Sequence, residues 1–230
     1  MFKNYFFGLF FSSLLILSCN SNSQEPNLSV PDFEKGITQQ NIQLLDVRTN
    51  GEYQSGHLQY ALWADWTNQT EFQERVKALD KNKPIYTYCL SGGRSGAATK
   101  WLNENGFTAY NLSGGISGWK QANKPIEQTV TVPQISMQEY LSKIPSNKTV
   151  LVDFGAVWCP PCKAMAPILD SLVATDGSKF ILVKIDGGDQ TSICKALKVD
   201  GFPTFIIYKG GKEVWRKSGM VAASELVKQL

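Results

Sequence analysis

Short β-rich runs alternate with helical stretches in two separate segments of this 230-residue chain, and the alternation predicts two α/β domains. In the first segment we expect strands at 43–47, 85–88 and 108–111, with helices at 69–78 and 96–103. In the second we expect strands at 149–154, 180–184, 204–208 and 214–218, with helices at 162–175, 191–197 and 222–230. A proline-containing stretch separates the segments, and about 100 residues in each suffice for a modest core.

Composition narrows the function classes. Hydrophobic residues make up 43% of the chain and charged residues 19%, which excludes wholesale disorder. The net charge is +3 without a long basic run, so we expect no nucleic-acid partner. The single histidine, His57, excludes a histidine-rich metal centre, and we predict no metal and no cofactor. The candidate reactive residues are therefore the five cysteines, Cys19, Cys89, Cys159, Cys162 and Cys194.

The N-terminus has the pattern of a secretory signal. One cation, Lys3, precedes an apolar run that is too short to span a bilayer and stops at Leu17-Ser18-Cys19. This ending resembles the lipobox of bacterial lipoproteins, which implies a signal peptide at residues 1–18, lipidation of Cys19 and a flexible tether at 19–28. We therefore expect a lipid anchor on the periplasmic side of a bacterial membrane, with the outer membrane favoured over the inner. An ordinary signal peptide with an incidental cysteine is the alternative.

Cys89 lies where a predicted strand leads into a glycine-rich loop and then a helix. Gly92 and Gly93 permit a tight turn that directs successive backbone N–H groups at the sulfur, and a helix starting near Ser95 adds its positive dipole end. Such surroundings favour a thiolate over a thiol. The alternative is a small buried cysteine at a strand end.

Residues 30–122 resemble the rhodanese family of sulfurtransferases. The motifs that carry the resemblance are Leu45-Asp46-Val47-Arg48, Glu52-Tyr53, Gly56-His57, Cys89 to Ser95 and Leu112 to Trp119. The resemblance implies a parallel-sheet domain at residues 29–124 and a persulfide on Cys89. It also implies a pocket lined by the five residues that follow, Leu90, Ser91, Gly92, Gly93 and Arg94. We expect His57 to be structural, and Asp46 and Arg48 to brace the loop.

The length of the Cys89 loop bears on its substrate. Arg94 comes five positions after Cys89, one fewer than in the related cysteine phosphatases, so the loop suits a sulfur atom or thiosulfate and crowds a phosphate ester. Leu90 stands where thiosulfate-using members often carry a cation. We expect a sulfane-sulfur donor, either thiosulfate or a persulfide, and a hydrophobic or protein-bound persulfide fits Leu90 better.

Residues 149–168 run from a buried-type strand through Trp158 and Cys159-Pro160-Pro161-Cys162 into a helix. The two intervening residues leave both sulfurs within bonding reach. At the helix N-terminus, free N–H groups and the dipole stabilise a thiolate on Cys159. We therefore expect an exposed attacking Cys159 and a shielded resolving Cys162. Half of a zinc site is the alternative, but it would need two more ligands.

This second segment resembles thioredoxin over residues 133–230. The resemblance rests on Trp158, Asp153, Lys184 and Gly201-Phe202-Pro203-Thr204-Phe205. It implies a thioredoxin fold at residues 135–230 after a linker at 125–134, so that the chain has two three-layer α/β domains. It further implies that Asp153 lies beneath the disulfide and takes a proton from Cys162.

The same resemblance gives Pro203 a cis peptide bond, in a loop that faces the cysteines and pairs with substrate backbone. Phe202 is bulky for that loop and would narrow the choice of substrate. Cys194 has an apolar-face spacing with Leu197, which indicates a core cysteine rather than a third redox thiol.

These features predict a thiol–disulfide oxidoreductase coupled to a rhodanese-type sulfurtransferase. Cys89 would receive sulfane sulfur, Cys159 would attack the persulfide, and Cys162 would resolve the product and release sulfide. The expected partners are a sulfane-sulfur donor, client protein disulfides and an external thiol reductant such as a membrane electron carrier. One alternative is a general protein disulfide reductase whose first domain is a docking module. Another is a non-enzymatic pocket at Cys89 that senses small anions.

Overall fold

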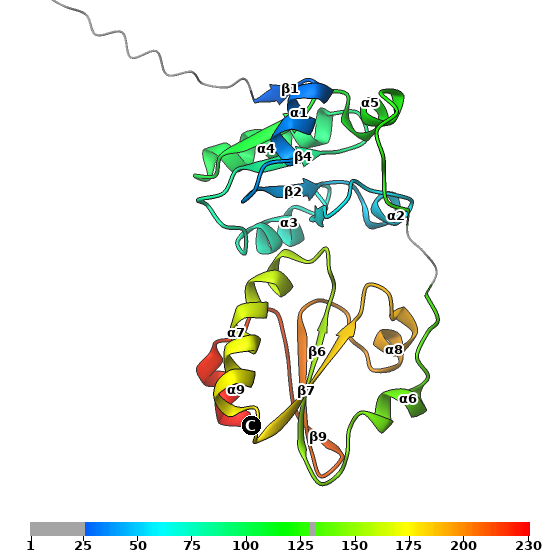
Figure 1. Ribbon diagram of the computed structural model, residues 1–230, viewed down its shortest axis with the longest axis vertical. Coiled ribbons are helices and arrows are strands. Elements are labelled where there is room, and N and C mark those ends of the chain that lie inside the picture. Colours follow the sequence, from blue (N-terminus) through cyan, green and yellow to red (C-terminus); the bar gives the residue numbers. More distant parts are fainter. Residues whose placement is uncertain (1–25, 129–131) are drawn as a thin grey trace, which may run out of the picture.

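The computed structural model describes residues 26–128 and 132–230, which form two α/β domains, one above the other in Figure 1. The expected fold class is confirmed: a parallel-sheet domain of the rhodanese type precedes a thioredoxin-fold domain. The predicted signal peptide and Cys19 lie outside the described residues. Within them, none of the helices combines the length and the apolar character needed to cross a membrane.

The first sheet is parallel throughout, with the order β1-β5-β4-β2-β3. Its strands are β1 (Asn27–Leu28), β2 (Gln43–Asp46), β3 (Leu62–Trp63), β4 (Ile85–Tyr88) and β5 (Ala109–Leu112). Asp46 pairs with both Tyr88 and Trp63, so the carboxyl ends of β4, β2 and β3 lie at one edge. The structure differs from the predicted tether at its end, because the last two tether residues form β1 and pair with β5.

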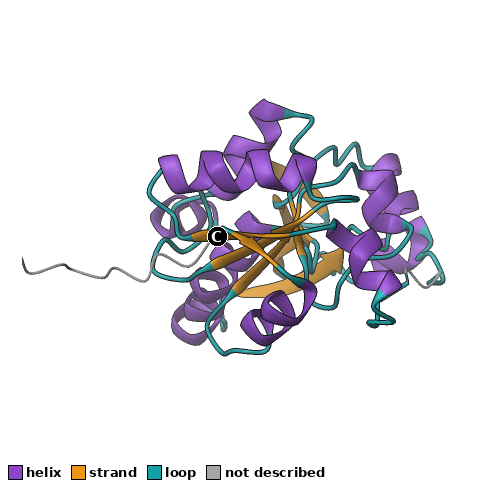
Figure 2. Ribbon diagram, turned by 90° about the horizontal axis from the view of Figure 1, so that it is seen from above, coloured by secondary structure: helices purple, strands orange, loops and turns teal. Residues whose placement is uncertain are grey.

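Helices cover both faces of this sheet, and in Figure 2, which looks down on the molecule, helices lie on either side of the central strands. One face carries α1 (Val30–Ile37), α2 (Asn50–Gln54) and α5 (Gly115–Gln121), and the other carries α3 (Gln69–Val76) and α4 (Gly93–Glu104). Side chains alternate along β4, so Tyr86 and Tyr88 belong to the first core cluster while Ile85 and Cys89 belong to the second. The sulfur of Cys89 therefore lies on the α3–α4 side.

The second sheet has the order β7-β6-β8-β9, in which β6 runs parallel to β7 and antiparallel to β8. Its strands are β6 (Thr149–Gly155), β7 (Phe180–Asp186), β8 (Thr204–Lys209) and β9 (Lys212–Ser218). Helices α6 (Met137–Ser142) and α8 (Thr191–Ala196) cover one face, and α7 (Pro160–Asp176) and α9 (Ala223–Gln229) cover the other. Because both faces of β6 are covered, its residues are mostly apolar, with Asp153 as the charged exception, and its carboxyl end leads to the two cysteines.

The domains meet where the edge strand β3 faces the turn between β6 and α7. The Trp63 N–H donates a 2.8 Å hydrogen bond to the Trp158 carbonyl. The Trp158 ring packs against Trp63, with ring centroids 5.2 Å apart, and against Tyr53, at 6.2 Å. The second domain thus covers an edge that would otherwise expose unpaired backbone groups.

Candidate active site

The Cys89 loop holds the sulfur of a buried cysteine against backbone donors. The Gly92 N–H lies 3.1 Å from Cys89 Sγ, and Gly92 adopts φ +99° as the N-cap of α4. Burial opposes ionisation of this thiol. The loop groups that face the sulfur, the Ser95 hydroxyl and N–H and the N–H groups of Ser91 and Gly92, outweigh that effect, and the pKa of Cys89 is lowered. The loop can therefore hold a thiolate or a persulfide anion.

The start of α5 fixes the back of this loop. The Ile116 N–H donates to the Cys89 carbonyl at 2.8 Å, and the Ser117 N–H donates to the Leu90 carbonyl at 3.0 Å. A Cβ on Gly115, which has φ +57°, would lie 2.5 Å from the Cys89 carbonyl oxygen. Only glycine fits this close approach. The Leu90 side chain remains 48% exposed.

Arg94 pairs with a carboxylate, Glu52, and also faces the Cys89 sulfur, and both partners raise the pKa of Arg94. Its Nη1 and Nη2 donate to Glu52 Oε2 and Oε1 at 2.7 and 2.5 Å. The Arg94 guanidinium lowers the pKa of Glu52 to about 2, so the pair is ionised at neutral pH. In the sequence, Glu52 belongs to a motif of the rhodanese resemblance, but its pairing with Arg94 was not predicted. Its position three residues after Thr49, in a helix capping box, was the available signal.

The other polar residues of the first domain support the segment that meets the second domain. Asp46 and Arg48 form a buried ion pair at 2.6 Å, and Arg48 also donates to the Gly56 carbonyl at 2.7 Å. The His57 ring stacks on Tyr53 with centroids 4.0 Å apart, and the His57 backbone bridges to Glu127. These contacts hold the path from β2 to β3, whereas Glu52 and α5 hold the Cys89 loop.

The second pair of cysteines forms a disulfide at the N-terminus of α7, with Cα atoms 5.3 Å apart. Cys159 is the N-cap residue, and the Cys162 N–H lies 3.2 Å from its sulfur. Pro160 and Pro161 occupy the first helical positions, which lack intrahelical N–H partners in any case. The helix therefore begins two residues earlier than we predicted.

The predicted exposure of the two cysteines was wrong. Cys159 is completely buried and Cys162 is half-buried, the reverse of an exposed attacker and a shielded resolver. The reason is the contact between the domains, because Tyr53 and Trp63 pack on Trp158 and cover the residue that follows it. In this arrangement an outside protein does not reach the Cys159 sulfur.

Asp153 lies beneath the disulfide. Its Oδ1 is buried and has no hydrogen-bond partner among the described residues. A Cβ on Gly155 would lie 3.6 Å from Cys162 Sγ and 3.8 Å from Asp153 Oδ1, so the sulfur and the carboxyl group flank the same glycine. Burial raises the pKa of Asp153 to about 6, and the Lys184 charge opposes this only in part. A carboxyl group with that pKa suits proton exchange with Cys162.

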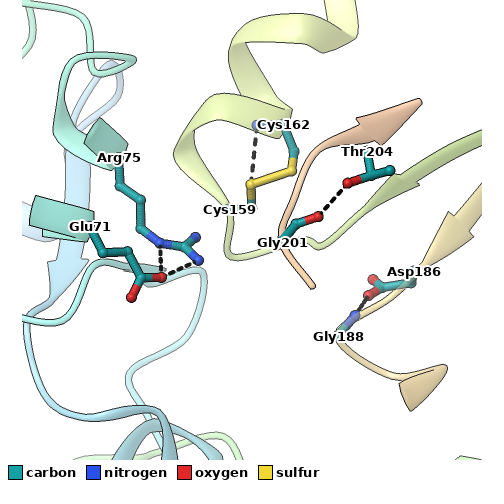
Figure 3. The surroundings of a disulfide bond; sticks show 8 residues. All are labelled: Glu71, Arg75, Cys159, Cys162, Asp186, Gly188, Gly201 and Thr204. Atoms are coloured by element: carbon teal, nitrogen blue, oxygen red, sulfur yellow. Dashed lines mark hydrogen bonds and ion pairs between the residues drawn. A yellow bond between two sulfur atoms is a disulfide. The ribbon is translucent and has the colours of Figure 1, made fainter. Parts of the chain in front are cut away.

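The Phe202–Pro203 peptide bond is cis, as predicted. The Phe202 ring lies 5.9 Å from the Trp158 ring, and in Figure 3 the neighbouring residues Gly201 and Thr204 lie beside the disulfide. Cys194 is buried in the core under α8, and burial raises its pKa to about 11. Its thiol therefore stays protonated at neutral pH.

The two sulfur sites do not touch. Cys89 follows Tyr88, which is two strands away from Trp63 across β2, a span of about 10 Å. The hydrogen bond from Trp63 to Trp158 and one further residue then lead to Cys159. Direct attack of one sulfur on the other therefore needs a different arrangement of the domains.

Comparisons with known proteins agree with this division. The rhodanese-like domain family matches residues 29–122, and the thioredoxin family matches residues 129–230. Thioredoxin Y, chloroplastic, from Oryza sativa subsp. japonica is 44% identical over 95 residues, which cover 41% of this chain and 55% of the relative. Thioredoxin from Mycobacterium bovis is 31% identical over 104 residues, which cover 45% of this chain and 90% of the relative.

Among solved structures, a rhodanese-related protein from Thermoplasma volcanium matches with a TM-score of 0.41 and 25% identity, over 46% of this chain and 100% of that protein. The chain spans about half the length of the first curated relatives that it matches. With its disulfide at the start of α7 and its cis-proline loop, this chain belongs to the thioredoxin family, and it carries a rhodanese-like domain ahead of the thioredoxin domain.

Proposed function

We propose that the chain is an extracytoplasmic thiol–disulfide oxidoreductase coupled to a rhodanese-type sulfurtransferase. The observation that carries this proposal is the pairing of two sulfur sites in one chain. Cys89 has a lowered pKa inside a ring of donors, and Cys159 with Cys162 can open to a dithiol and close to a disulfide. Thiolate attack on a sulfur–sulfur bond is the elementary step at both sites.

The proposed reaction balances in atoms and electrons. The Cys89 thiolate attacks the sulfane sulfur of a donor, whose own sulfur–sulfur bond breaks, and leaves a Cys89 persulfide. The Cys159 thiolate attacks the outer sulfur of that persulfide, takes it and returns Cys89 as a thiolate. Cys162 then attacks Cys159, which closes the disulfide and releases sulfide. The two electrons that reduce the sulfane sulfur come from the dithiol, and an external thiol reductant restores it.

The Asp153 carboxyl group is available to accept the proton that Cys162 loses. Cys162 must lose its proton as it attacks Cys159, and the Asp153 carboxyl group flanks Gly155 beside it. With a pKa of about 6, Asp153 is mostly ionised near pH 7 and accepts that proton.

The transfer from Cys89 to Cys159 requires the Trp63–Trp158 contact to break. That contact is one hydrogen bond with edge-to-face packing of the Trp158 ring on Trp63 and Tyr53, and relative motion of domains is the ordinary expectation for a modest interface. Because both sites belong to one chain, the effective concentration of one near the other remains high while the domains are apart.

The form of the Cys89 pocket favours one class of donor. The exposed Leu90 side chain offers an apolar surface, and Glu52 already neutralises Arg94. A dianion such as thiosulfate finds no unpaired arginine there. We therefore propose a hydrophobic or protein-bound persulfide as the donor, with thiosulfate a poor one.

The test uses a chain that can load sulfur but cannot discharge it. Replacing Cys159 and Cys162 with serine should leave a Cys89 persulfide visible by intact mass after donor exposure, while sulfide release stops. Cys194→Ser is the matched control and should release sulfide at the wild-type rate. Unchanged sulfide release from the double variant would refute the coupled mechanism.

A general disulfide reductase is the second candidate, and the contact of the first domain with Trp158, the residue before Cys159, favours it. On that reading the rhodanese-like domain is a docking module that covers the thioredoxin-type site until a client protein displaces it. Reduction of insulin disulfides by Cys89→Ser at the wild-type rate, together with no sulfur loading of the wild-type chain, would select this function.

The proposed location rests on the motif that ends at Cys19. Several acyl chains on one cysteine give durable anchoring where one chain would be marginal. Metabolic labelling with a radioactive fatty acid should mark the wild-type protein on the periplasmic side of the membrane and leave Cys19→Ser unlabelled. Equal labelling of both would exclude lipidation at Cys19.

A further inference from the structure

Arg75 is a buried arginine of the first domain at the contact with the second. It lies on α3 with only 9% of its surface exposed. Its guanidinium lies over the Trp63 ring at 4.6 Å from the centroid and over the Trp158 ring at 5.4 Å. The group thus bridges the two domains at the residue that immediately precedes Cys159.

Two of the three nitrogens of the Arg75 guanidinium have a hydrogen-bond acceptor, and the third has none among the described residues. Nε and Nη2 both donate to Glu71 Oε1, at 2.8 and 2.7 Å. Nη1 is buried and has no hydrogen-bond partner among the described residues. An unsatisfied buried donor of a charged group is costly, so it marks a place where an acceptor belongs. In Figure 3 the guanidinium extends from α3 toward the turn that carries Cys159.

The other charged groups around Cys159 would disfavour a thiolate there. Asp153 on β6 lies under Cys162, and Asp186 at the end of β7 accepts the N–H of Gly188 beside Trp158. Of the lysines, Lys163 is exposed and Lys184 contacts Asp170 at 3.4 Å. Burial opposes ionisation of a sulfur as well. Within the thioredoxin domain, the N-terminus of α7 is the feature that favours a thiolate on Cys159.

We propose that Arg75 is a positioning residue of the thioredoxin-type site, a cation that the rhodanese-like domain supplies to stabilise the Cys159 thiolate once the disulfide is reduced. Glu71 moderates this effect, because its carboxylate partly neutralises the guanidinium. The inference rests on the thiol–disulfide part of the proposed function and is independent of sulfur transfer from Cys89. Sequence reasoning could not find it, because Glu71 and Arg75 read as an ordinary pair four residues apart on a helix.

The experiment titrates Cys159 in the full-length chain. Cys19→Ser, Cys89→Ser and Cys162→Ser remove the other thiols that would titrate in this range, and Cys194 titrates only at about pH 11. Thiolate ultraviolet absorbance against pH then gives the Cys159 pKa. Adding Arg75→Gln should raise it by about one unit, a tenfold loss of thiolate at pH values well below the pKa. Glu71→Gln should lower it, and Arg75→Lys, which keeps the charge, should stay closer to the parent.

The opposite signs separate this role from a structural one. A purely structural Arg75 predicts that Arg75→Gln and Glu71→Gln move the pKa in the same direction or not at all, and either result would overturn the proposal. If Arg75→Gln fails to fold, Glu71→Gln still decides, since an unchanged or raised Cys159 pKa contradicts the inference. Sulfide release, measured separately in chains that keep all their cysteines, reports on the proposed function alone.

Discussion

Cys89 and Cys159 occupy equivalent places in their domains but depend on different parts of the molecule. Each follows an interior strand of its sheet and precedes a helix that begins beyond the carboxyl end of that strand. The donors and the ion pair around Cys89 all come from its own domain. Cys159 has the N-terminus of α7 but is covered by the other domain. A local loop can therefore be recognised in a sequence, whereas a site completed by docking cannot.

The largest expected effect comes from exchanging the two nucleophiles for serine, because a hydroxyl cannot form the sulfur–sulfur bond. Cys89→Ser should abolish sulfur loading and leave the reduction of small disulfides intact. Cys159→Ser should abolish the reduction of small disulfides and leave sulfur loading intact. Each lost activity should fall on the order of 1,000-fold. Intact mass after donor exposure and a small-disulfide reduction assay measure the two. Loss of both activities in either variant would show that the sites are not separable.

Gly115→Ala should damage the Cys89 site through its backbone. The added Cβ would lie 2.5 Å from the Cys89 carbonyl oxygen at a φ of +57°, and the combined overpacking and strain should cost roughly 2–4 kcal/mol of unfolding free energy. Urea unfolding measures this cost. Gly93→Ala, where a Cβ meets nothing within 4 Å, is the matched control and should be nearly neutral. Equal costs for both would contradict the close approach.

Asp153→Asn should stabilise the protein near pH 7. A carboxyl pKa raised to about 6 means that the folded state favours the neutral acid. That contribution is complete below the ordinary pKa of 3.8 and is lost as pH rises through about 6. The shift means that the ionised Asp153 lowers the free energy of unfolding by roughly 3 kcal/mol at pH 7. An asparagine amide without a hydrogen-bond partner costs about 1 kcal/mol, so the net gain from Asp153→Asn is about 2 kcal/mol. Urea unfolding at pH 7 and pH 4 should show the gain only at the higher pH, and a gain at both would exclude the titration.

Glu52→Gln should have the smallest effect. The pKa of Glu52 is lowered to about 2. The ionised carboxylate therefore contributes fully to the free energy of unfolding above the ordinary pKa of 4.5, and this contribution is lost as pH falls toward 2. The pair is partly exposed, and the loss should be about 1 kcal/mol at pH 7 and vanish at pH 2. The same variant frees Arg94 and should improve the use of thiosulfate relative to a persulfide donor. Poorer use of thiosulfate would contradict the neutralising role of Glu52.

The longer elements were predictable from sequence. Each expected strand and helix overlaps a real one, because apolar runs bounded by glycine or proline mark them clearly. The structure adds six elements: β1, α1, α2, β3, α5 and α6. They have from two to eight residues, a range that also includes predicted elements such as β2 and α8, so length alone does not explain why they were missed.

The site was predictable only where it is local. The loop from Cys89 to Arg94 and the turn at Cys159 were found from spacing and residue type. The burial of Cys159 depends on β3 reaching Trp158, a contact between residues 95 positions apart that no local pattern encodes. Glu52 and Arg75 were missed for the same reason, because each acts on a segment distant in sequence.

In the proposed mechanism, sulfur passes from Cys89 to the dithiol of the same chain. A single-turnover experiment tests it most directly: the fully reduced chain receives one equivalent of a persulfide donor, and sulfide and the Cys159–Cys162 disulfide are followed together. The proposed mechanism predicts one sulfide for each disulfide formed, after Cys89 gains and loses the mass of one sulfur atom, at a rate that does not change with protein concentration. A stable Cys89 persulfide beside an unreacted dithiol, or a rate proportional to protein concentration, would contradict it.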